Sequence, residues 1–194
     1  MDYIFIEEET EFRAVIKKSI FTAYIKPINN EEDAKNLIEN IRKNNKDVGH
    51  VAYAYNITDV VNNKPNTTSR YSDDGEPSKT AGFPIQQLIE RHSITNTIIA
   101  VSRVFGGTLL GTAGLIRAYG GAAGMVFRNA KTIKRPLTTP FYHSINIKQL
   151  SKAKAYIKNN NLTHKEEFFG ENVNLTINIP INTNIKEEFL SNLS

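Results

Sequence analysis

The stretch Asp73-Asp74-Gly75-Glu76-Pro77 places three carboxylates within four consecutive positions. Carboxylates grouped this closely could hold Mg²⁺ through water molecules, or work as an acid and a base. Asp-Gly is also a common turn signal, and carboxylates just ahead of a helix accept hydrogen bonds from its free N–H groups. We favour this capping role, and we expect no bound metal and no cofactor.

His50 is a second candidate for chemistry, because histidine is the side chain that enzymes use most often as a general base. No Ser or Cys stands in a matching motif beside it, and the chain contains no cysteine. A base without a nucleophile and an orienting group does not make a catalytic arrangement. We therefore favour a hydrogen-bonded structural role for His50 and assign no catalytic residue.

Glycines concentrate in one stretch, since six of the 11 in the sequence fall between Gly106 and Gly121. This stretch follows an apolar, β-branched segment, 97–102, and precedes a helical pattern, 115–129. A strand, a glycine loop and a helix in this order leave free N–H groups at the positive end of the helix dipole, where anions bind. Gly111-Thr112 lacks the lysine of the phosphate-binding pattern G-x-x-x-x-G-K-[ST], so we reject a nucleoside triphosphate site. The glycines serve either an anion-binding surface or tight turning and packing, and the sequence leaves both open.

The helix predicted over residues 115–129 has a face of arginines and glycines, spaced by four, three and four positions. These residues are Arg117, Gly121, Gly124 and Arg128. Arginine offers planar, bidentate donors to phosphate. Glycine inside a helix costs about 1 kcal/mol relative to alanine, and close packing against another element would explain it as well as close approach of a polyanion. We favour packing for Gly121 and Gly124, and leave binding and packing open for Arg117.

The composition allows a polyanionic partner without requiring one. The 194 residues carry a formal net charge of +4, with a pI near 9.2. Without cysteine there is no disulfide, thiol nucleophile or cysteine-based zinc site. The N-terminus lacks a basic start followed by an apolar core, and no apolar run approaches the roughly 20 residues of a membrane helix. We expect a cytoplasmic protein with no membrane partner.

Periodicity predicts strands and helices in an α+β protein. Strands are predicted over residues 11–16, 19–25, 51–57, 95–105, 138–147, 163–169 and 172–179. Helices are predicted over residues 31–44, 81–91, 115–129, 149–160 and 184–193, and residues 58–79 are predicted to be a long loop. A boundary near Pro136 separates domains 1–135 and 136–194. The second has the order β-α-β-β-α, a split β-α-β pattern lacking a final strand.

Several of these residues also form the motifs of a known family. D-D-G-E-P-S-x-T-A-G stands at 73–82, F-G-G-x-x-L-G-x-x-G-L-x-R-A-Y-G at 105–120, and H-x-x-Y-A-Y at 50–55. Together with Lys18-Ser19-x-Phe21, these motifs occur in the order typical of the IMPACT/YigZ family. The chain resembles the bacterial YigZ-like branch of that family from Lys17 to about Lys134.

The resemblance implies an N-terminal α/β sandwich like the second domain of ribosomal protein S-five and domain IV of elongation factor G. It also implies a small ferredoxin-like C-terminal domain, similar to domain V of the same factor. The sequence departs from the family pattern at Lys79, Val104 and Ala113. It stops at Ser194, where relatives often continue into a last strand, so we expect the C-terminal sheet to lack that strand.

The resemblance further implies a nucleic-acid- or ribosome-binding protein linked to the regulation of translation. We expect the acidic turn, the glycine loop and Arg117 to form one cleft for RNA or the ribosome. The candidate binding residues are His50, Arg70, Asp73, Asp74, Glu76, Thr80, Arg103, Gly106, Gly107, Gly111, Gly114 and Arg117. Two alternatives stay open: a metal-assisted enzyme acting on a phosphorylated small molecule or nucleotide, and an adaptor that binds a protein partner in translation control.

Overall fold

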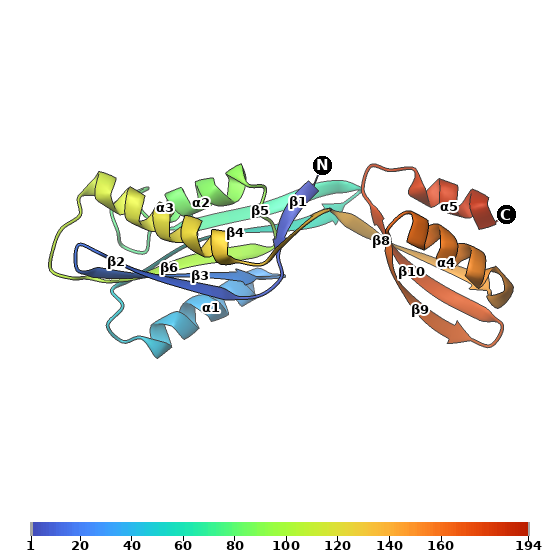
Figure 1. Cartoon of the computed structure of the whole chain (residues 1–194), viewed down its shortest axis with the longest axis horizontal. Helices are drawn as coiled ribbons and strands as arrows, with labels where there is room; N and C mark the ends of the chain where they lie inside the picture. Colours follow the sequence, from blue (N-terminus) through green and yellow to red (C-terminus); the bar gives the residue numbers. More distant parts are fainter. Residues whose placement is uncertain (1, 194) are drawn as a thin grey trace. The chain divides into compact units, whose positions relative to one another are not determined.

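The computed structural model describes residues 2–193 of the chain (Figure 1). Its internal contacts divide it into two compact units. The N-terminal unit holds Met1–Asp59 and Thr67–Arg135, and the C-terminal unit holds Val60–Asn66 and Pro136–Ser194. Among the described helices, none is both long and apolar enough to span a membrane.

Within the described residues, the N-terminal unit is built on a five-stranded sheet with the order β2-β3-β6-β4-β5. The strands are β2 (Thr10–Ile16), β3 (Ser19–Pro27), β4 (His50–Val61), β5 (Lys64–Ser72) and β6 (Thr97–Val104). β6 lies between β3 and β4 and pairs with both in antiparallel register. Two short strands, β1 (Asp2–Ile6) and β7 (Thr132–Pro136), pair with each other.

Helices cover both faces of this sheet (Figure 1). α2 (Gly82–Arg91) and α3 (Thr112–Asn129) lie on one face, and α1 (Glu31–Asn44) lies on the other. α1 begins where predicted, because the Asn30 side chain accepts a hydrogen bond of 2.9 Å from the backbone N–H of Asp33.

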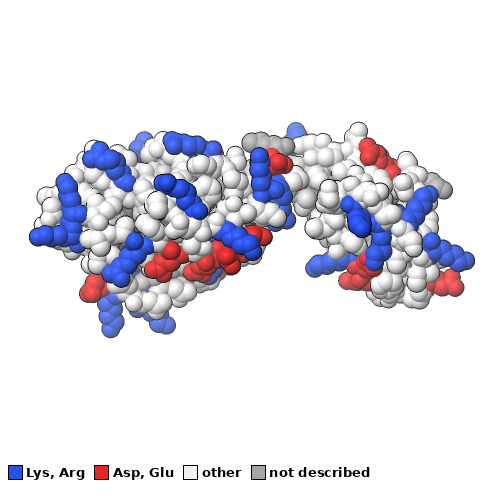
Figure 2. All heavy atoms as spheres, in the orientation of Figure 1, with Lys and Arg blue, Asp and Glu red and all other residues white. Residues whose placement is uncertain are grey.

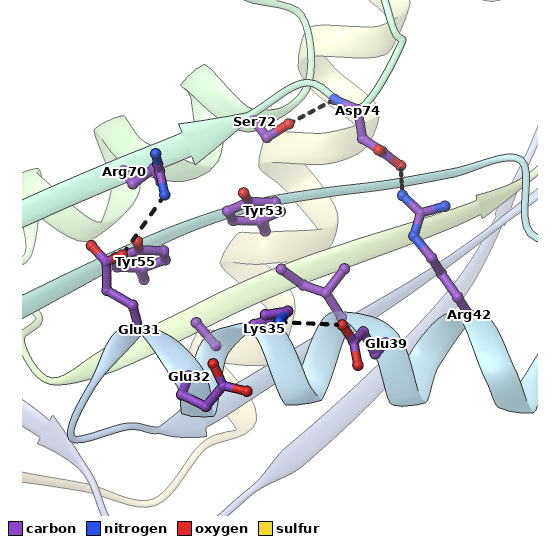
Figure 3. Close-up of a pocket in the computed structure, with 12 residues that line it drawn as sticks. Glu31, Glu32, Lys35, Glu39, Arg42, Tyr53, Tyr55, Arg70, Ser72 and Asp74 are labelled. Carbon is purple, nitrogen blue, oxygen red and sulfur yellow. Dashed lines mark hydrogen bonds and ion pairs between the residues drawn. The ribbon is translucent and has the colours of Figure 1, made fainter.

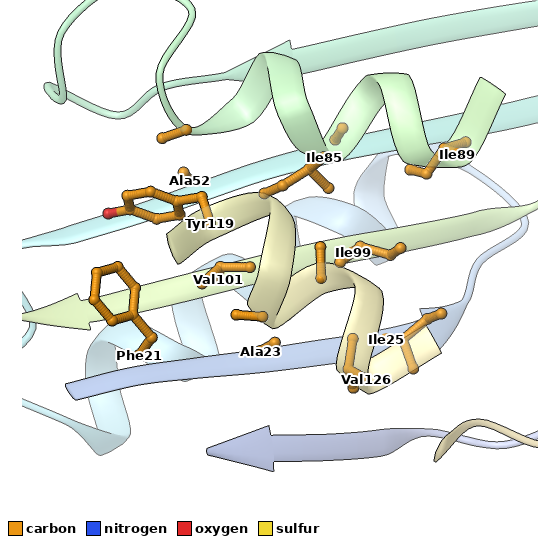
Figure 4. Close-up of a cluster of buried hydrophobic side chains, with 14 of the residues drawn as sticks. Phe21, Ala23, Ile25, Ala52, Ile85, Ile89, Ile99, Val101, Tyr119 and Val126 are labelled. Atoms are coloured by element: carbon orange, nitrogen blue, oxygen red, sulfur yellow. The ribbon is translucent and has the colours of Figure 1, made fainter. Parts of the chain in front are cut away.

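The core explains why β6 is apolar along its whole length. Ile99 and Val101 face α2 and α3, whereas Ile98 and Ala100 face α1, and all four are fully buried. A strand that is covered on both faces reads as a continuous apolar run instead of an alternating one. Figure 4 shows Tyr119 of α3 packed on the face of the sheet that α2 and α3 cover, beside Phe21 and Val101. The buried strand β6 ends at Val104, and the glycine loop begins directly after it.

The long loop predicted over residues 58–79 is wrong as far as Ser72. β4 continues to Val61 and β5 begins at Lys64. The two turn residues, Asn62 and Asn63, have φ angles of 52° and 59°, the left-handed values that a tight hairpin turn needs. The hairpin was missed because nearly every residue of β5 is exposed, which leaves no apolar alternation to read.

The C-terminal unit has the predicted order of elements. They are β8 (Thr138–Asn146), the short 3-10 helix η1 (Ile147–Gln149), α4 (Leu150–Asn159), β9 (Thr163–Phe169), β10 (Asn172–Pro180) and α5 (Ile185–Leu193). In the described part of the chain they form a three-stranded antiparallel sheet with β10 at its centre. α4 and α5 bury one face of that sheet through residues such as Ile157 and Phe189. The two units together confirm the predicted α+β class.

Candidate functional site

The acidic turn and the glycine loop meet around a cavity of about 430 Å³, which we call the loop pocket. Its apolar walls come from the two loops and from the start of α3. They are Pro77, Phe105, Leu109, Leu110 and Leu115. Its polar lining consists of His50, Glu76, Arg103, Gly111 and Thr112. Four residues predicted for the site, His50, Glu76, Arg103 and Gly111, therefore line one cavity, although they come from different parts of the sequence.

Asp73 caps the start of α2. Its carboxylate accepts hydrogen bonds from the backbone N–H groups of Lys79, Ala81 and Gly82, at 2.8, 3.0 and 2.9 Å. These hydrogen bonds satisfy donors that the helix itself leaves unpaired. They are the capping role favoured from the sequence.

Asp74 is also engaged within the chain. Its carboxylate pairs with Arg42 and accepts a hydrogen bond from the backbone N–H of Val51. Its backbone carbonyl accepts a hydrogen bond of 2.7 Å from Nδ1 of His50. Since a carbonyl only accepts, Nδ1 carries a proton, and a neutral His50 ring keeps Nε2 as its acceptor.

Glu76 and Arg103 form a buried ion pair at the loop pocket. Oε1 of Glu76 lies 2.7 Å from Nη1 of Arg103 and accepts a hydrogen bond of 2.8 Å from the Tyr119 hydroxyl. Only 7% of the Arg103 side chain and 4% of the Glu76 side chain are exposed. The guanidinium also lies over the rings of Phe21 and Phe105.

These interactions change the expected role of Arg103. It was predicted to bind a polyanion, but its charge is compensated inside the protein and its side chain is covered. The physical reason is its place on β6, whose neighbours on both sides bury it. The same surroundings raise the pKa of Tyr119 far above its usual range, first through burial and then through its hydrogen bond to Glu76. A neutral Tyr119 hydroxyl therefore remains a donor to Glu76.

The glycine loop combines one tightly packed glycine with two open ones. A Cβ on Gly106 would lie 2.0 Å from the backbone carbonyl of Lys18, so only glycine allows the loop to approach the β2–β3 turn. Gly107 and Gly111 have φ angles of +81° and +69°, and a Cβ at either would meet nothing within 4 Å. Gly111 precedes α3, which has no side-chain cap. The first turn of α3 therefore presents N–H groups beside the loop pocket.

A smaller hollow of about 220 Å³ lies beside the loop pocket and shares Leu110 with it. Lys17 of the β2–β3 turn and Arg117 of α3 both line this hollow. None of its described lining residues is acidic. Lys17, Lys18 and Arg117, all exposed, are called the basic rim below. Figure 2 shows Lys and Arg side chains at the end of this unit where the β2–β3 turn lies.

Lys17 and Lys18 were not among the predicted site residues. The available signal was a pair of adjacent lysines at a hairpin turn, which is usually only a solvated loop. Their φ angles of 45° and 65° confirm the tight turn. What places them at the site is the close approach of Lys18 to Gly106, which joins segments more than 80 positions apart and leaves no trace in local sequence.

Six of the predicted site residues line neither the loop pocket nor the smaller hollow: Arg70, Asp73, Asp74, Thr80, Gly106 and Gly107. The Thr80 hydroxyl is buried and donates to the carbonyl of Pro77 at 2.6 Å. Arg70 lines a different cavity, of about 480 Å³, beside α1 (Figure 3). There it lies 3.8 Å from Glu31.

Cations and carboxylates in this second cavity pair with each other. Besides the Arg70–Glu31 pair, Lys35 pairs with Glu39 and Arg42 with Asp74, as the dashed lines of Figure 3 show. Paired charges leave little net attraction for an anion. The loop pocket and the basic rim are therefore the stronger candidate site.

The packing role expected for Gly121 is wrong within the described chain. A Cβ there would meet nothing within 4 Å. At Gly124 an added Cβ would lie 3.6 Å from Cδ1 of Leu88, an ordinary van der Waals distance. Gly114 is close to Leu110, which would stand 2.9 Å from an added Cβ. Only the last of these three glycines has a packing neighbour that a Cβ would displace.

The fold and the site together describe an α+β protein of two units, in which the glycine loop and the acidic turn line one pocket. Residues 17–127 match the model of the Impact N-terminal domain, and the chain belongs to the IMPACT family. The IMPACT family member YvyE of Bacillus subtilis is 30% identical over 171 residues, which cover 88% of this chain and 76% of that relative. A Thermus thermophilus member is 31% identical over 168 residues, covering 86% and 87%. YigZ of Escherichia coli is 35% identical over 126 residues, covering 63% and 59%.

One solved structure supports the fold. That structure, described as that of a hypothetical protein, superposes with a TM-score of 0.66 at 26% identity, covering 99% of this chain and 91% of the other. The two-domain translational regulator Yih1 gives a TM-score of 0.38 at 24% identity, covering 64% and 46%. That second superposition is too weak to relate the functions of the two proteins.

Proposed function

We propose that this protein binds single-stranded RNA through the basic rim and the first turn of α3. The observation that carries the proposal is the hollow between Lys17 and Arg117. Two cations line it, its described lining contains no carboxylate, and neither cation makes an ion pair with any described residue. Their charges are therefore available to a partner.

The chemistry of these groups suits the phosphates of a nucleic-acid strand. Arg117 offers two parallel N–H donors to a phosphate, and Lys17 and Lys18 offer compact positive charge. The uncapped N–H groups at the start of α3 favour negative charge at the same place. The acidic turn does not compete for the phosphates, because its carboxylates are engaged with Arg42, Arg103 and backbone N–H groups.

We further propose that this RNA belongs to the translation machinery. Support comes from the family resemblance of the motifs, which implies an N-terminal fold like that of ribosomal and elongation-factor domains. The expected behaviour is co-sedimentation with ribosomes at low salt and release as salt rises. A metal-assisted enzyme has weaker support, because Asp73, Asp74 and Glu76 each serve different partners and do not converge on one point.

The test is the binding of a fluorescent eight-nucleotide RNA to the full chain at several salt concentrations. The double variant Lys17→Ala/Arg117→Ala is expected to weaken binding. It should also reduce the slope of log K against log salt by about 0.7 for each phosphate that is no longer neutralised. Lys35→Ala/Lys43→Ala removes the same charge from α1, on the other face of the sheet, and should change the slope little.

Equal reductions in affinity in the two double variants would reject the basic rim as the binding surface, because they would report net charge alone. Undiminished binding in Lys17→Ala/Arg117→Ala would reject it as well. Thermal unfolding of both variants serves as the check that they remain folded.

A further inference from the structure

The loop pocket has a lining unlike that of the basic rim beside it. Five apolar side chains form its walls, and Phe105 and Leu109 remain 54% and 83% exposed. Its volume of about 430 Å³ lies within the range of roughly 300–1,000 Å³ that is usual for ligand sites. Apolar walls of this extent serve to bury a flat or apolar group and cannot bind a phosphate.

Polar groups in the same pocket supply both an acceptor and donors. The His50 ring lines the pocket, and its bond to the Asp74 carbonyl leaves Nε2 as the acceptor of a neutral ring. Thr112, at the first position of α3, contributes a hydroxyl and an uncapped N–H. Arg103 also lines the pocket, and its Nε is buried without a hydrogen-bond partner among the described residues.

The pocket and the basic rim are adjacent, since Leu110 lines both the pocket and the hollow between Lys17 and Arg117. A ligand that fills both places must join an uncharged, largely apolar group to an anion. One nucleotide has this composition: a base with donors and acceptors on its edge and aromatic faces, linked through ribose to a phosphate. Proteins read single-stranded RNA by stacking unpaired bases on aromatic side chains and bonding their edges.

We propose that the loop pocket receives one base of the bound strand, while the phosphate of that nucleotide lies at the basic rim. Phe105 offers its exposed ring to the base, with Leu109 and Leu115 beside it. His50 and Thr112 bond the edge of the base. This inference rests on the proposed RNA binding and adds to it a specific place for a base.

The experiment compares two strands on the unaltered full chain. One is an eight-nucleotide oligouridylate, and the other is a strand of equal length with stable abasic spacers at every position. The phosphates are the same, so the basic rim should bind both. A stacked base contributes about five- to 150-fold to affinity, so oligouridylate is expected to bind tighter by a factor in that range.

Variants of the pocket locate the effect. Phe105→Ala/Leu109→Ala should bring the affinity for oligouridylate down to that for the abasic strand, and leave the abasic strand unaffected. Tyr142→Ala removes an aromatic ring that is 72% exposed in the C-terminal unit, and should preserve the preference for bases. Thermal unfolding checks that each variant is folded.

A second arm adds 5′-UMP as a competitor of the oligouridylate. Displacement would assign the pocket to a free nucleotide as well as to a strand, and binding that resists 5′-UMP would assign it to a strand alone. Equal affinities for oligouridylate and the abasic strand would overturn the base pocket while leaving RNA binding intact. Loss of the preference in Tyr142→Ala, but not in Phe105→Ala/Leu109→Ala, would also overturn it. Failure of both strands to bind would instead reject the proposed function.

Discussion

At the scale of single residues, Glu76 holds together the inner side of the loop pocket. It joins Arg103 of β6 to Tyr119 of α3 through two short interactions of 2.7 and 2.8 Å. Removing one partner of a buried ion pair leaves the other charge without compensation. The pocket therefore depends on a residue that a ligand scarcely reaches.

Glu76→Gln is expected to lower the free energy of unfolding by about 3–5 kcal/mol, because Arg103 would stay buried and uncompensated. Urea unfolding followed by circular dichroism measures the change. Glu31→Gln is the control, since the Arg70–Glu31 pair is exposed to solvent and should contribute little to stability. If both substitutions had the same small effect, the Glu76–Arg103 pair would not be a structural anchor.

The raised pKa of Tyr119 should make the free energy of unfolding depend on pH in the alkaline range. Burial and the hydrogen bond to Glu76 raise its pKa in the folded state, whereas the unfolded chain ionises near the ordinary value of about 10. The contribution of Tyr119 to the free energy of unfolding is therefore fully present below about pH 10. It is lost as the pH rises above that value, because the folded state then binds more protons than the unfolded one.

Tyr119→Phe should lower stability at pH 8 and reduce its further loss between pH 10 and 11. The unaltered protein should lose about 1 kcal/mol more than the variant between pH 10 and 11, less if unfolding sets in first. Unfolding free energies of both proteins across this range give the comparison. Parallel curves would mean that Tyr119 titrates normally in the folded state.

At the scale of elements, the glycine loop is shaped by two different requirements. Gly106 must lack a Cβ because the backbone of Lys18 occupies that space, whereas Gly107 needs only a left-handed φ. Gly106→Ala should therefore be more destabilising than Gly107→Ala, which should cost about 1–2 kcal/mol for the backbone conformation alone. Urea midpoints rank the two variants, and the opposite ranking would contradict the observed approach of the β2–β3 turn.

Gly121 allows the reverse prediction. It lies inside α3, its Cβ would meet open space, and its φ is not left-handed. Gly121→Ala should raise the free energy of unfolding by about 1 kcal/mol, through the higher helix propensity of alanine. A loss of stability in thermal unfolding would mean that a packing neighbour of Gly121 exists after all.

Elements with local signals could be predicted from the sequence. α1 carries its own cap at Asn30 and an apolar stripe of Ala34, Leu37 and Ile41. β5 carries no such signal, because its residues are exposed and it is held by pairing with β4. β1 and β7 were not predicted for a related reason. They pair with each other, although most of the sequence of the N-terminal unit lies between them.

The candidate site, like the fold, could be predicted only where the local sequence carries a signal. The acidic turn and the glycine loop could be found as motifs, and their meeting at one pocket could be expected. The engagement of Arg103 with Glu76 depends on packing between segments 27 positions apart. One signal was available: an arginine in an apolar strand covered on both faces must have a buried partner.

At the scale of the whole molecule, the basic rim and the loop pocket both belong to the N-terminal unit. The C-terminal unit has a core of its own, formed by residues of β8, β10, α4 and α5. A short RNA strand should therefore bind at one end of the N-terminal unit and leave the C-terminal unit unaffected.

The most direct measurement is a titration of the ¹⁵N-labelled full chain with an eight-nucleotide single-stranded RNA, followed by backbone amide NMR. Amide shifts are expected at Lys17 and Lys18 and over residues 105–117, growing weaker as salt is added. Shifts confined to α1 or to the C-terminal unit, or none at RNA concentrations that saturate binding by fluorescence, would contradict the account.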